Sequence, residues 1–296
     1  MSLIPFDDRE GHIWLDGKLV PWRDAKIHVL THGLHYGSSI FEGQRVYSRK
    51  VFALEQHTGR LFQSARLMGF EIPFTQDQIN DACRQVVEAQ GLDDAYMRPV
   101  AWRGSEQMAV SAQKSKIHVA IAVWPWPSMF DPEIKKKGIA MDIARWRRPA
   151  PDTTPWKAKA AGLYMICTLS KHEAEAKGLS DAMMYDWRGL VAEATGANIF
   201  FVKDNRLFTP HADCFLNGLT RQTVMKLARA RQIEVVETYI QSNDVQGFSE
   251  CFLTGSAAEV TPVGKIGNWQ FEVGNITRTL MDDYANHVRG KYAPGL

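Results

Sequence analysis

Two lysines stand in an apolar, small-residue segment that can change the chemistry of an amine. The segment runs from 155 to 164 and reads P-W-K-A-K-A-A-G-L-Y. Burial disfavours the charged form of lysine, and a neutral amine is a good nucleophile toward a carbonyl and a usable general base. Most lysines at the start of a helix are simply solvated. The residue types alone therefore leave Lys157 and Lys159 open as reactive or ordinary side chains.

A carboxylate and two glycine-containing turns could bind a charged small molecule. Glu193 lies among small and apolar residues before a predicted strand, where a carboxylate needs a partner. That partner is either a protonated heteroaromatic nitrogen or a structural arginine. The stretch 217–221, N-G-L-T-R, opens a predicted helix with exposed amides, which suits an anion but also an ordinary helix cap. The turn 254–259, T-G-S-A-A-E, could bind phosphate, bind carboxylate or only turn.

Other constellations give weaker signals. His28, His32 and His35 have ligand-like spacings, but no HExxH helix or carboxylate cluster accompanies them, so we predict no metal site. A G-x-S-x-G nucleophile elbow is missing as well. The four cysteines are far apart and form no CxxC pair, which favours a reducing cytoplasm over a disulfide framework: Cys83, Cys167, Cys214 and Cys251.

Length and composition narrow the classes of partner. The chain has 296 residues, of which 45% are hydrophobic, enough for two modest cores. A net charge of +2 gives no strong positive potential that would attract nucleic acid. Small molecules or further copies of the chain are therefore the expected partners. The start of the chain does not read as a signal peptide, and the longest apolar run, 119–124, is too short to span a membrane. A cytoplasmic protein without membrane contact is expected.

The first half of the chain mixes hairpins and helices. Thr75 and Gln78 stand at capping-box spacing, and Gly91 follows the helix that they begin. We predict a smaller N-terminal α/β domain over 1–128 and an interdomain loop over 129–138. Its elements are hairpins over 12–22 and 39–54, helices near 55–69 and 76–90, and strands near 95–102 and 116–124.

The second half predicts a larger C-terminal α/β domain over 139–296. It lacks the regular βαβ alternation and the GxGxxG turn of a dinucleotide-binding sheet. The fold class is therefore mixed α/β (α+β) in two domains and not Rossmann. The predicted elements are strands near 139–146, 181–187, 197–209, 234–240 and 250–254, with helices near 160–177, 220–232 and 275–289.

Taken in order, these segments resemble the fold-type IV pyridoxal-phosphate enzymes, and most closely the branched-chain amino acid aminotransferases. The resemblance covers nearly the whole chain. It includes V-L-T-H-G-L-H-Y-G-S-S-I-F-E-G at 29–43, H-T-G-R-L at 57–61, E-A-T-G-A-N-I-F at 193–200 and G-S-A-A-E-V-T-P at 255–262. It implies the two-domain fold of the D-amino acid aminotransferase type, with the C-terminal domain carrying the reactive lysine.

The resemblance assigns the cofactor, pyridoxal 5′-phosphate. The K-A-x-G-x-Y pattern selects Lys159, not Lys157, as the residue that forms the Schiff base and moves the proton during transfer. Glu193 would keep the pyridine nitrogen protonated. The remaining implied cofactor contacts are Tyr164 near the ring and, around the phosphate, Arg60, Leu219, Thr220, Gly255 and Ser256.

The resemblance also implies a substrate site and an assembly. Tyr36, Tyr96 and Arg98 would bind the α-carboxylate with the amide of Ala257. An apolar side-chain pocket would be walled by Phe41, Tyr164 and Trp126. Members of the family are homodimers or larger, and a neighbouring subunit completes their active site.

The implied reaction is the ping-pong transfer of an amino group from leucine, isoleucine or valine to 2-oxoglutarate. The same fold also supports a D-amino acid or (R)-amine aminotransferase and an aminodeoxychorismate lyase, and a non-catalytic protein that binds the cofactor is a remote alternative. Three positions depart from the family pattern. They are Asn217 in place of proline, Ser256 in place of threonine, and Met129 or Phe130 in place of an interdomain tyrosine.

Overall fold

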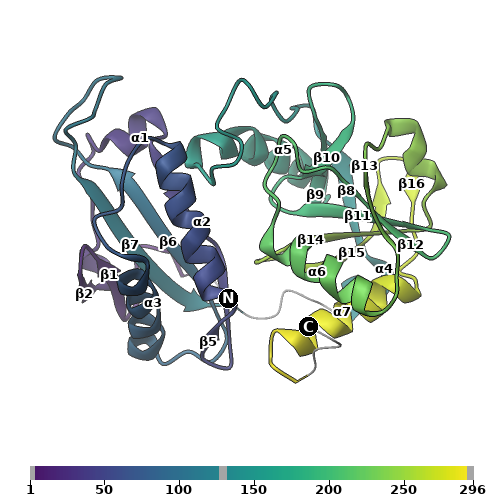
Figure 1. Cartoon of the computed structure of the whole chain (residues 1–296), viewed down its shortest axis with the longest axis horizontal. Helices are drawn as coiled ribbons and strands as arrows, with labels where there is room; N and C mark the ends of the chain where they lie inside the picture. Colours follow the sequence, from purple (N-terminus) through teal and green to yellow (C-terminus); the bar gives the residue numbers. More distant parts are fainter. Residues whose placement is uncertain (1–3, 127–131, 292–296) are drawn as a thin grey trace. The chain divides into compact units, whose positions relative to one another are not determined.

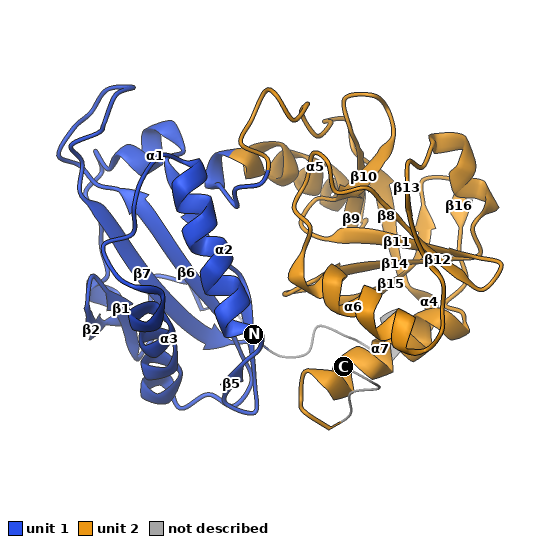
Figure 2. Cartoon of the chain, viewed as in Figure 1, with its two compact units in different colours: residues 1–127, 157–162 blue, residues 128–156, 163–296 orange. Residues whose placement is uncertain are grey.

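The computed structural model describes residues 4–126 and 132–291, and it divides into two compact units (Figure 2). Unit 1 comprises Met1–Pro127 with Lys157–Gly162, and unit 2 comprises Ser128–Trp156 with Leu163–Leu296. The expected domain boundaries instead place 157–162 in the C-terminal domain. The segment groups with unit 1 because its backbone bonds there, through a bridge between Ile40 and Ala160. Met129 and Phe130 lie outside the described residues.

An antiparallel sheet forms the centre of unit 1 (Figure 1). In its described part this sheet has seven strands in the order β2-β1-β7-β6-β4-β5, and β3 also pairs with β6. The β1–β2 hairpin turns at Asp16 and Gly17, both with positive φ, as the sequence predicts. The strands are β1 (His12–Leu15), β2 (Lys18–Pro21), β3 (Ser39–Phe41), β4 (Gln44–Tyr47), β5 (Lys50–Val51), β6 (Ala95–Arg103) and β7 (Ile117–Pro125).

Two long helices cover this sheet. The second, α3 (Gln76–Gln90), begins at the predicted capping box, where Thr75 Oγ1 accepts a bond from Gln78 N. It ends at Gly91, whose φ of 63° is the left-handed conformation that glycine adopts readily. Its apolar face is buried against β1 and β7. The helices of unit 1 are η1 (Trp22–Asp24), α1 (His32–Tyr36), α2 (Leu54–Leu67) and α3 (Gln76–Gln90).

Unit 2 contains a mixed sheet. Its described strands number nine, in the order β10-β9-β8-β15-β14-β11-β12-β13, with β16 beside β15. The pairs β8–β9, β8–β15 and β12–β13 are parallel, and the others are antiparallel. The strands are β8 (Ile139–Ile143), β9 (Asp181–Tyr185), β10 (Val191–Ala194), β11 (Asn198–Lys203), β12 (Arg206–Pro210), β13 (Val235–Thr238), β14 (Glu250–Gly255), β15 (Glu259–Ile266) and β16 (Trp269–Gln270).

The helices of unit 2 pack on this sheet, with α5 against β9, α6 against β14 and α7 against β14 and β15. Residues 132–137 form a short helix where the sequence predicts a loop. Glu133 lies 3.2 Å from Lys137 one turn later, a spacing that favours a helix. The helices are α4 (Pro132–Lys137), α5 (Met165–Ala176), α6 (Leu219–Ala230), η3 (Ser242–Gly247) and α7 (Asn275–His287), and η2 (Ala161–Tyr164) begins in unit 1 and ends in unit 2.

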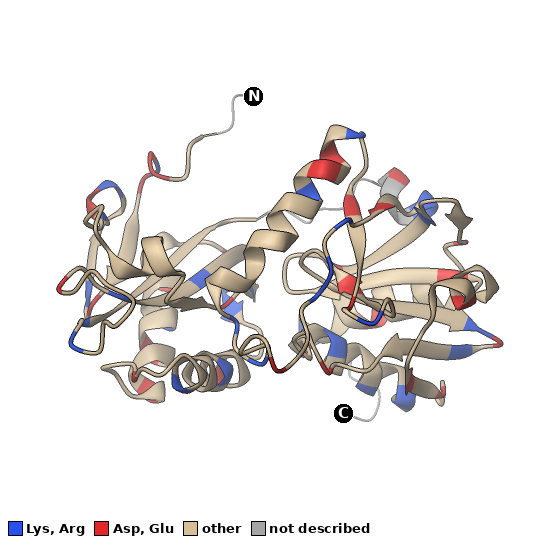
Figure 3. Cartoon of the chain, turned by 90° about the horizontal axis from the view of Figure 1, so that it is seen from above, with Lys and Arg blue, Asp and Glu red and all other residues tan. Residues whose placement is uncertain are grey.

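Charges of both signs are interspersed along the elements of each unit (Figure 3), in line with the net charge of +2. Across the described ranges, 4–126 and 132–291, the structure contains no helix that is both long and apolar enough to cross a bilayer.

Candidate active site

Lys159 lies beside β3 in unit 1. Its carbonyl oxygen accepts a bond from Phe41 N at 3.0 Å, and its own N donates to Ser64 Oγ on α2 at 3.0 Å. The Nζ atom lies 4.9 Å from the centre of the Phe41 ring. Burial, and after it the Arg60 guanidinium, lowers the pKa of Lys159 to about 8, although the Glu42 carboxylate opposes this. About a tenth of such amines are neutral at pH 7, several hundred times the fraction for an ordinary lysine.

Glu42, which follows β3, is a fully buried carboxylate bonded to two side chains of α2. Arg60 donates from Nε to Oε1 at 2.6 Å and from Nη2 to Oε2 at 2.7 Å. His57 Nδ1 lies 2.7 Å from Oε2. Burial by itself would raise the pKa of Glu42, but Arg60 and then His57 outweigh burial and hold this pKa well below its usual range. Burial lowers the pKa of His57, so its neutral ring donates through Nδ1.

Arg60 is the residue that the family resemblance assigns to the phosphate. Its two bonds to Glu42 use two of the five N–H donors of a guanidinium. An arginine held by a carboxylate in this way has a fixed orientation and can still bind a phosphate oxygen. The phosphate contact itself stays a prediction.

Most residues predicted to contact the substrate gather near Lys159. The Arg98 guanidinium lies 4.6 Å from the centre of the Phe41 ring, and Arg98 Nη2 donates to the Tyr96 hydroxyl at 3.2 Å. Trp126 packs against Tyr96 with the ring centroids 5.1 Å apart. This part of unit 1 therefore combines an aromatic surface, the guanidinium of Arg98 and one amine of lowered pKa.

Tyr36 is the exception in unit 1. It ends α1, is 47% exposed, and its ring stacks on His32 with the centroids 4.6 Å apart. Its ring contact among the described residues is with His32, whereas Tyr96 packs against Trp126.

Glu193 lies on β10 of unit 2, where Arg148 and Asn198 lie beside its carboxylate. Arg148 Nε lies 3.2 Å from Oε1, and Asn198 Nδ2 donates to Oε2 at 3.1 Å. Arg148 also donates from Nη1 to Cys167 Sγ at 3.3 Å. Of the two partners that the sequence leaves open for Glu193, the structure shows an arginine. A carboxylate has about four acceptor positions, so these contacts are compatible with a further donor.

Two backbone segments of unit 2 stand at the positions predicted for the phosphate. Gly218 is the N-cap of α6 and has no side chain with which to cap the helix, and Leu219 and Thr220 carry the first amides after it. The second turn, Ser256–Ala258, joins β14 to β15 and contains Ala257, which the sequence assigns to the substrate. Asn217, one of the departures, accepts a bond from Arg221 Nη1 at 2.8 Å.

Tyr164 ends η2 and precedes α5. It packs on a small buried cluster that includes Ala144 and Cys167. Tyr164 also acts electrostatically on Arg148. Burial alone would lower the pKa of Arg148, but Glu193 and, more weakly, Tyr164 raise it above its ordinary value. Tyr164 and Glu193 are therefore linked through one buried guanidinium in unit 2.

The histidines considered as metal ligands bond protein groups. His32 uses both ring nitrogens, toward Ser38 Oγ and Ala109 O, and His35 Nε2 lies 2.9 Å from Val29 O. His28 Nδ1 accepts from Leu30 N.

One group of possible metal ligands does occur in the described residues, formed by Asp186, Asp213 and Cys214. The guanidinium of Arg188 already bonds both carboxylates of this group, from Nε to Asp186 at 2.8 Å and from Nη2 to Asp213 at 2.8 Å. This arginine supplies the positive charge that the two carboxylates need.

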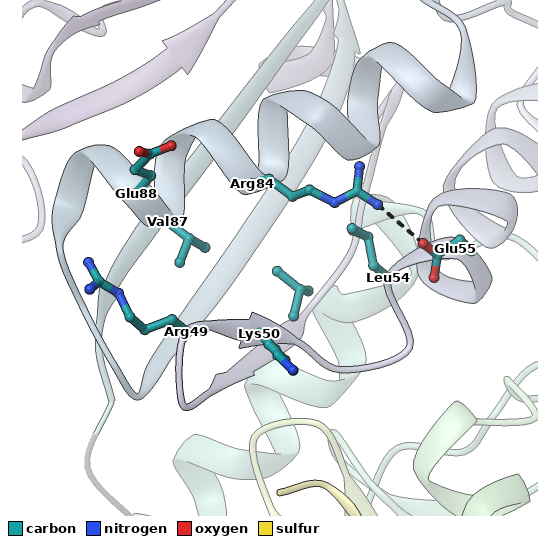
Figure 4. A pocket seen from close by; sticks show the side chains of 8 residues that line it. Arg49, Lys50, Leu54, Glu55, Arg84, Val87 and Glu88 are labelled. Carbon is teal, nitrogen blue, oxygen red and sulfur yellow. Dashed lines mark hydrogen bonds and ion pairs between the residues drawn. The ribbon is translucent and has the colours of Figure 1, made fainter. Parts of the chain in front are cut away.

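A hollow of about 430 Å³ lies beside β5, α2 and α3 in unit 1 (Figure 4). Arg84 crosses toward Glu55 there, with a contact of 3.4 Å. The other charged side chains in its lining are Arg49, Lys50 and Glu88. None of the residues predicted for cofactor or substrate lines this hollow.

The sequence reasoning missed Glu42, Arg148 and Asn198. Glu42 and Asn198 stand inside quoted motifs, F-E-G and G-A-N-I-F, but neither motif tells which side chain the residue bonds. Arg148 lies in a proline-rich stretch without a pattern of its own. A buried carboxylate needs a cation, and this requirement was the available signal that an arginine would lie near Glu193.

Comparison with known proteins identifies the family. Residues 39–266 match the family model for class-IV amino-transferases. A branched-chain-amino-acid aminotransferase of Pseudomonas aeruginosa is 41% identical over 291 residues, which cover 96% of this chain and 95% of that protein. The chain belongs to the class-IV aminotransferase family.

Solved structures of the family have the same fold. The branched-chain amino acid aminotransferase from Escherichia coli has a TM-score of 0.90 and 34% identity, and 97% of each chain is covered. The crystal structure of the branched-chain amino acid aminotransferase from Thermobaculum terrenum, in its pyridoxal-phosphate (holo) form, has a TM-score of 0.88 and 29% identity, with 96% of each chain covered. The mixed α/β, fold-type IV class predicted from the sequence is confirmed.

The side chains of this class-IV aminotransferase fit its family's cofactor. Lys159 offers an amine for an aldehyde, Glu193 a carboxylate for a protonated ring nitrogen, and the start of α6 offers amides for a phosphate. On β14, Thr254 Oγ1 is buried and has no hydrogen-bond partner within the described chain, directly before the Gly255 turn. The donor set thus matches the functional groups of pyridoxal phosphate.

Proposed function

We propose that this chain is a pyridoxal-phosphate-dependent aminotransferase that moves the amino group of branched-chain L-amino acids to 2-oxoglutarate. The observation that carries the proposal is Lys159, an amine with a pKa lowered to about 8, beside Phe41 and close to Arg98 and Tyr96. Full-length similarity to branched-chain aminotransferases supports it. The two half-reactions occur in turn at one site, as in a ping-pong scheme.

Lys159 has two functions in this scheme. Bound pyridoxal phosphate supplies an electron sink that makes the substrate's α-proton removable. Lys159 holds the cofactor through its Nζ and then accepts and returns that proton. Both roles need the neutral amine, and the lowered pKa provides a useful neutral fraction near pH 7.

Residues of unit 2 act on the polar ends of the cofactor. Glu193, which lies 3.2 Å from Arg148 and accepts a bond from Asn198, holds a proton at the ring nitrogen. The amides of Leu219, Thr220, Gly255 and Ser256 bind the phosphate, and we assign Arg60 of unit 1 to the same group.

Arg98 and Tyr96 orient the substrate through its α-carboxylate. Arg98 Nε is buried without a hydrogen-bond partner in the described part of the chain, as is Trp126 Nε1, so both can donate to a ligand. Phe41 and Trp126 provide apolar walls that suit an aliphatic side chain better than a charged one. We include Ala257 and Tyr36 in the substrate site and Tyr164 beside the cofactor ring.

Absorbance of the purified holoenzyme tests the function. The visible band of the bound cofactor should fall on addition of L-leucine and return on addition of 2-oxoglutarate. D-alanine and an (R)-amine serve as comparison donors. A band that responds only to these donors would contradict the branched-chain assignment, and no cofactor band at all would contradict the aminotransferase assignment.

We further propose that the protein is a homodimer or a larger homo-oligomer. Apolar side chains of one stretch of unit 1 are unusually exposed, with Val29 at 70%, Leu34 at 62% and Ile27 at 49%. Contiguous exposed apolar surface is typical of protein interfaces. Replacing Val29 and Leu34 together with glutamate should shift the molecular mass measured by light scattering from oligomer to monomer. An unchanged mass would contradict an interface at this stretch.

A cytoplasmic location is part of the proposal. Cys83, Cys167, Cys214 and Cys251 are all buried, and each is a thiol outside any disulfide. Burial raises the pKa of Cys83 and Cys214 to about 12 each, which makes these thiols unreactive. Free thiols are usual in a reducing compartment.

A further inference from the structure

One buried side chain, Asn198, connects two parts of unit 2 that the proposed function uses separately. Its Nδ2 donates to Glu193 Oε2 at 3.1 Å and to Leu216 O at 3.0 Å. Its Oδ1 accepts from Gly218 N at 3.1 Å. Asn198 is 5% exposed, and all three bonds lie inside the unit. A single carboxamide therefore bonds the Glu193 carboxylate and the last residues before α6.

The position of Asn198 in the sheet also brings it beside the β14–β15 turn. Asn198 is the first residue of β11, and its direct partner on the antiparallel strand β14 is Thr254. Residues directly opposite each other on antiparallel strands point to the same face. Thr254 is followed by Gly255, where the β14–β15 turn begins. The Glu193 strand, the start of α6 and the Gly255 turn thus meet around one residue.

The chemistry of these contacts requires a side-chain amide. Asparagine offers two N–H donors and one carbonyl acceptor on a short side chain, and the three bonds use both kinds of group. Aspartate would keep the acceptor for Gly218 N, but it would lose the donors and place a second negative charge beside Glu193. Alanine would leave buried polar groups of Glu193, Leu216 and Gly218 without this partner.

Position 218 provides an independent indication that the approach is close. A Cβ built on Gly218 would lie 2.4 Å from Asn198 Oδ1, nearer than side chains tolerate. The backbone of Gly218, at φ −59° and ψ 143°, is one that any residue can adopt. The contact with Asn198, and not the backbone conformation, is therefore what requires glycine here.

We propose that Asn198 is a positioning residue that fixes the Glu193 carboxylate relative to the amino end of α6, so that the ring nitrogen and the phosphate of one pyridoxal phosphate are bound at matched positions. The inference rests on the proposed function, and it assigns Asn198 no contact with the cofactor. A rigid cofactor gains from such a link because both of its ends are then bound without reorganising the protein.

The test compares two ligands, pyridoxal phosphate and phosphate-free pyridoxal. Dissociation constants are measured with cofactor-free protein, by absorbance, for wild type, Asn198→Ala and Gly218→Ala. In both variants the dissociation constant for pyridoxal phosphate should rise by about tenfold to a hundredfold. The preference for pyridoxal phosphate over pyridoxal should fall by at least about tenfold, because the loss arises from binding both ends together.

Gln222→Ala is the matched control. Gln222 Nε2 donates to Asn217 O at 2.9 Å, so this variant also removes a side-chain amide bond to the loop before α6 but leaves Glu193 untouched. Its preference for pyridoxal phosphate should equal that of wild type.

The outcomes separate the inference from the function on which it rests. A preference within about twofold of wild type in both Asn198→Ala and Gly218→Ala would overturn the positioning role, whatever their thermal stability. If circular dichroism shows that Asn198→Ala is unfolded, the same ratio in Gly218→Ala decides. Failure of wild type to bind pyridoxal phosphate would count against the proposed function and not against the link between Glu193 and α6.

Discussion

Replacing Lys159 with alanine is expected to lower the rate of amino transfer from L-leucine to 2-oxoglutarate by at least about a thousandfold. The substitution removes both the amine that holds the cofactor and the base that moves the α-proton, and a positioned base alone contributes about 10²–10⁴-fold. The measurement is kcat at saturating cofactor and substrates. Lys159 Nζ lies 4.9 Å from the centre of the Phe41 ring, so truncation removes a group at the centre of the proposed substrate site.

The chain provides a matched control two residues earlier. Lys157 is exposed and belongs to the same segment, yet no role is proposed for it. Lys157→Ala should keep kcat within about twofold of wild type, as expected for an exposed side chain. More than about a tenth of the wild-type rate in Lys159→Ala, or a large loss in Lys157→Ala, would show that the wrong lysine has been chosen.

The pH dependence of cofactor attachment gives a second measurement on Lys159. Because burial lowers its pKa to about 8, the rate of covalent attachment to cofactor-free protein should rise about tenfold per pH unit below 8 and level off above it. An ordinary lysine would give a rate that keeps rising toward pH 10.5. A continued rise past pH 9 would contradict the lowered pKa.

Much of the fold followed from local patterns in the sequence. The Thr75–Gln78 capping box and the Gly91 C-cap predicted the ends of α3 to within a residue, because cap chemistry is read from neighbouring residues. The Asp16-Gly17 turn predicted the first hairpin for the same reason. Strands β10 and β15 were not predicted. Both are short or interrupted by polar residues, and their pairing with β9 and β14 is decided by the sheet.

The sequence could propose a site residue where that residue acts through its own chemistry. Lys159, Glu193 and Arg98 were selected because an amine, a carboxylate and a guanidinium in known motifs suggest definite roles, and these roles stay predictions. Glu42 and Arg148 were missed because their function depends on a distant partner. Glu42 meets Arg60 only because β3 lies beside α2, and Arg148 meets Glu193 only because residue 148 bridges to residue 186, just past the end of β9.

Local sequence patterns also could not predict to which unit Lys159 belongs. The helical signal at 160–177 places the lysine at the start of a C-terminal element, and η2 with α5 indeed follows it. Its backbone, however, bonds Phe41 and Ser64 of unit 1. Such nonlocal pairing is not encoded in the periodicity of the segment itself.

Glu42→Gln is expected to lower the free energy of unfolding by about 3–5 kcal/mol, although the two side chains have nearly the same shape. Glu42 is 0% exposed and accepts three bonds from His57 and Arg60. The amide cannot accept all of these, and it leaves the Arg60 guanidinium without its buried counter-charge. Denaturant unfolding of the cofactor-free protein measures the change. Because Arg60 loses its fixed orientation, the affinity for pyridoxal phosphate should fall in parallel.

Glu55→Gln is the matched control, since Glu55 also pairs with an arginine but is 69% exposed, at 3.4 Å from Arg84. Glu55→Gln should lower the free energy of unfolding by less than about 1 kcal/mol. The pH dependence follows from the sign of the Glu42 shift. Its folded pKa lies below the ordinary 4.5, so its stabilisation is complete above that pH and is lost as the pH falls toward the folded value. The difference in free energy of unfolding between wild type and Glu42→Gln should therefore be largest above pH 4.5 and shrink in acid. Equal losses for Glu42→Gln and Glu55→Gln would mean that the buried cluster does not stabilise unit 1.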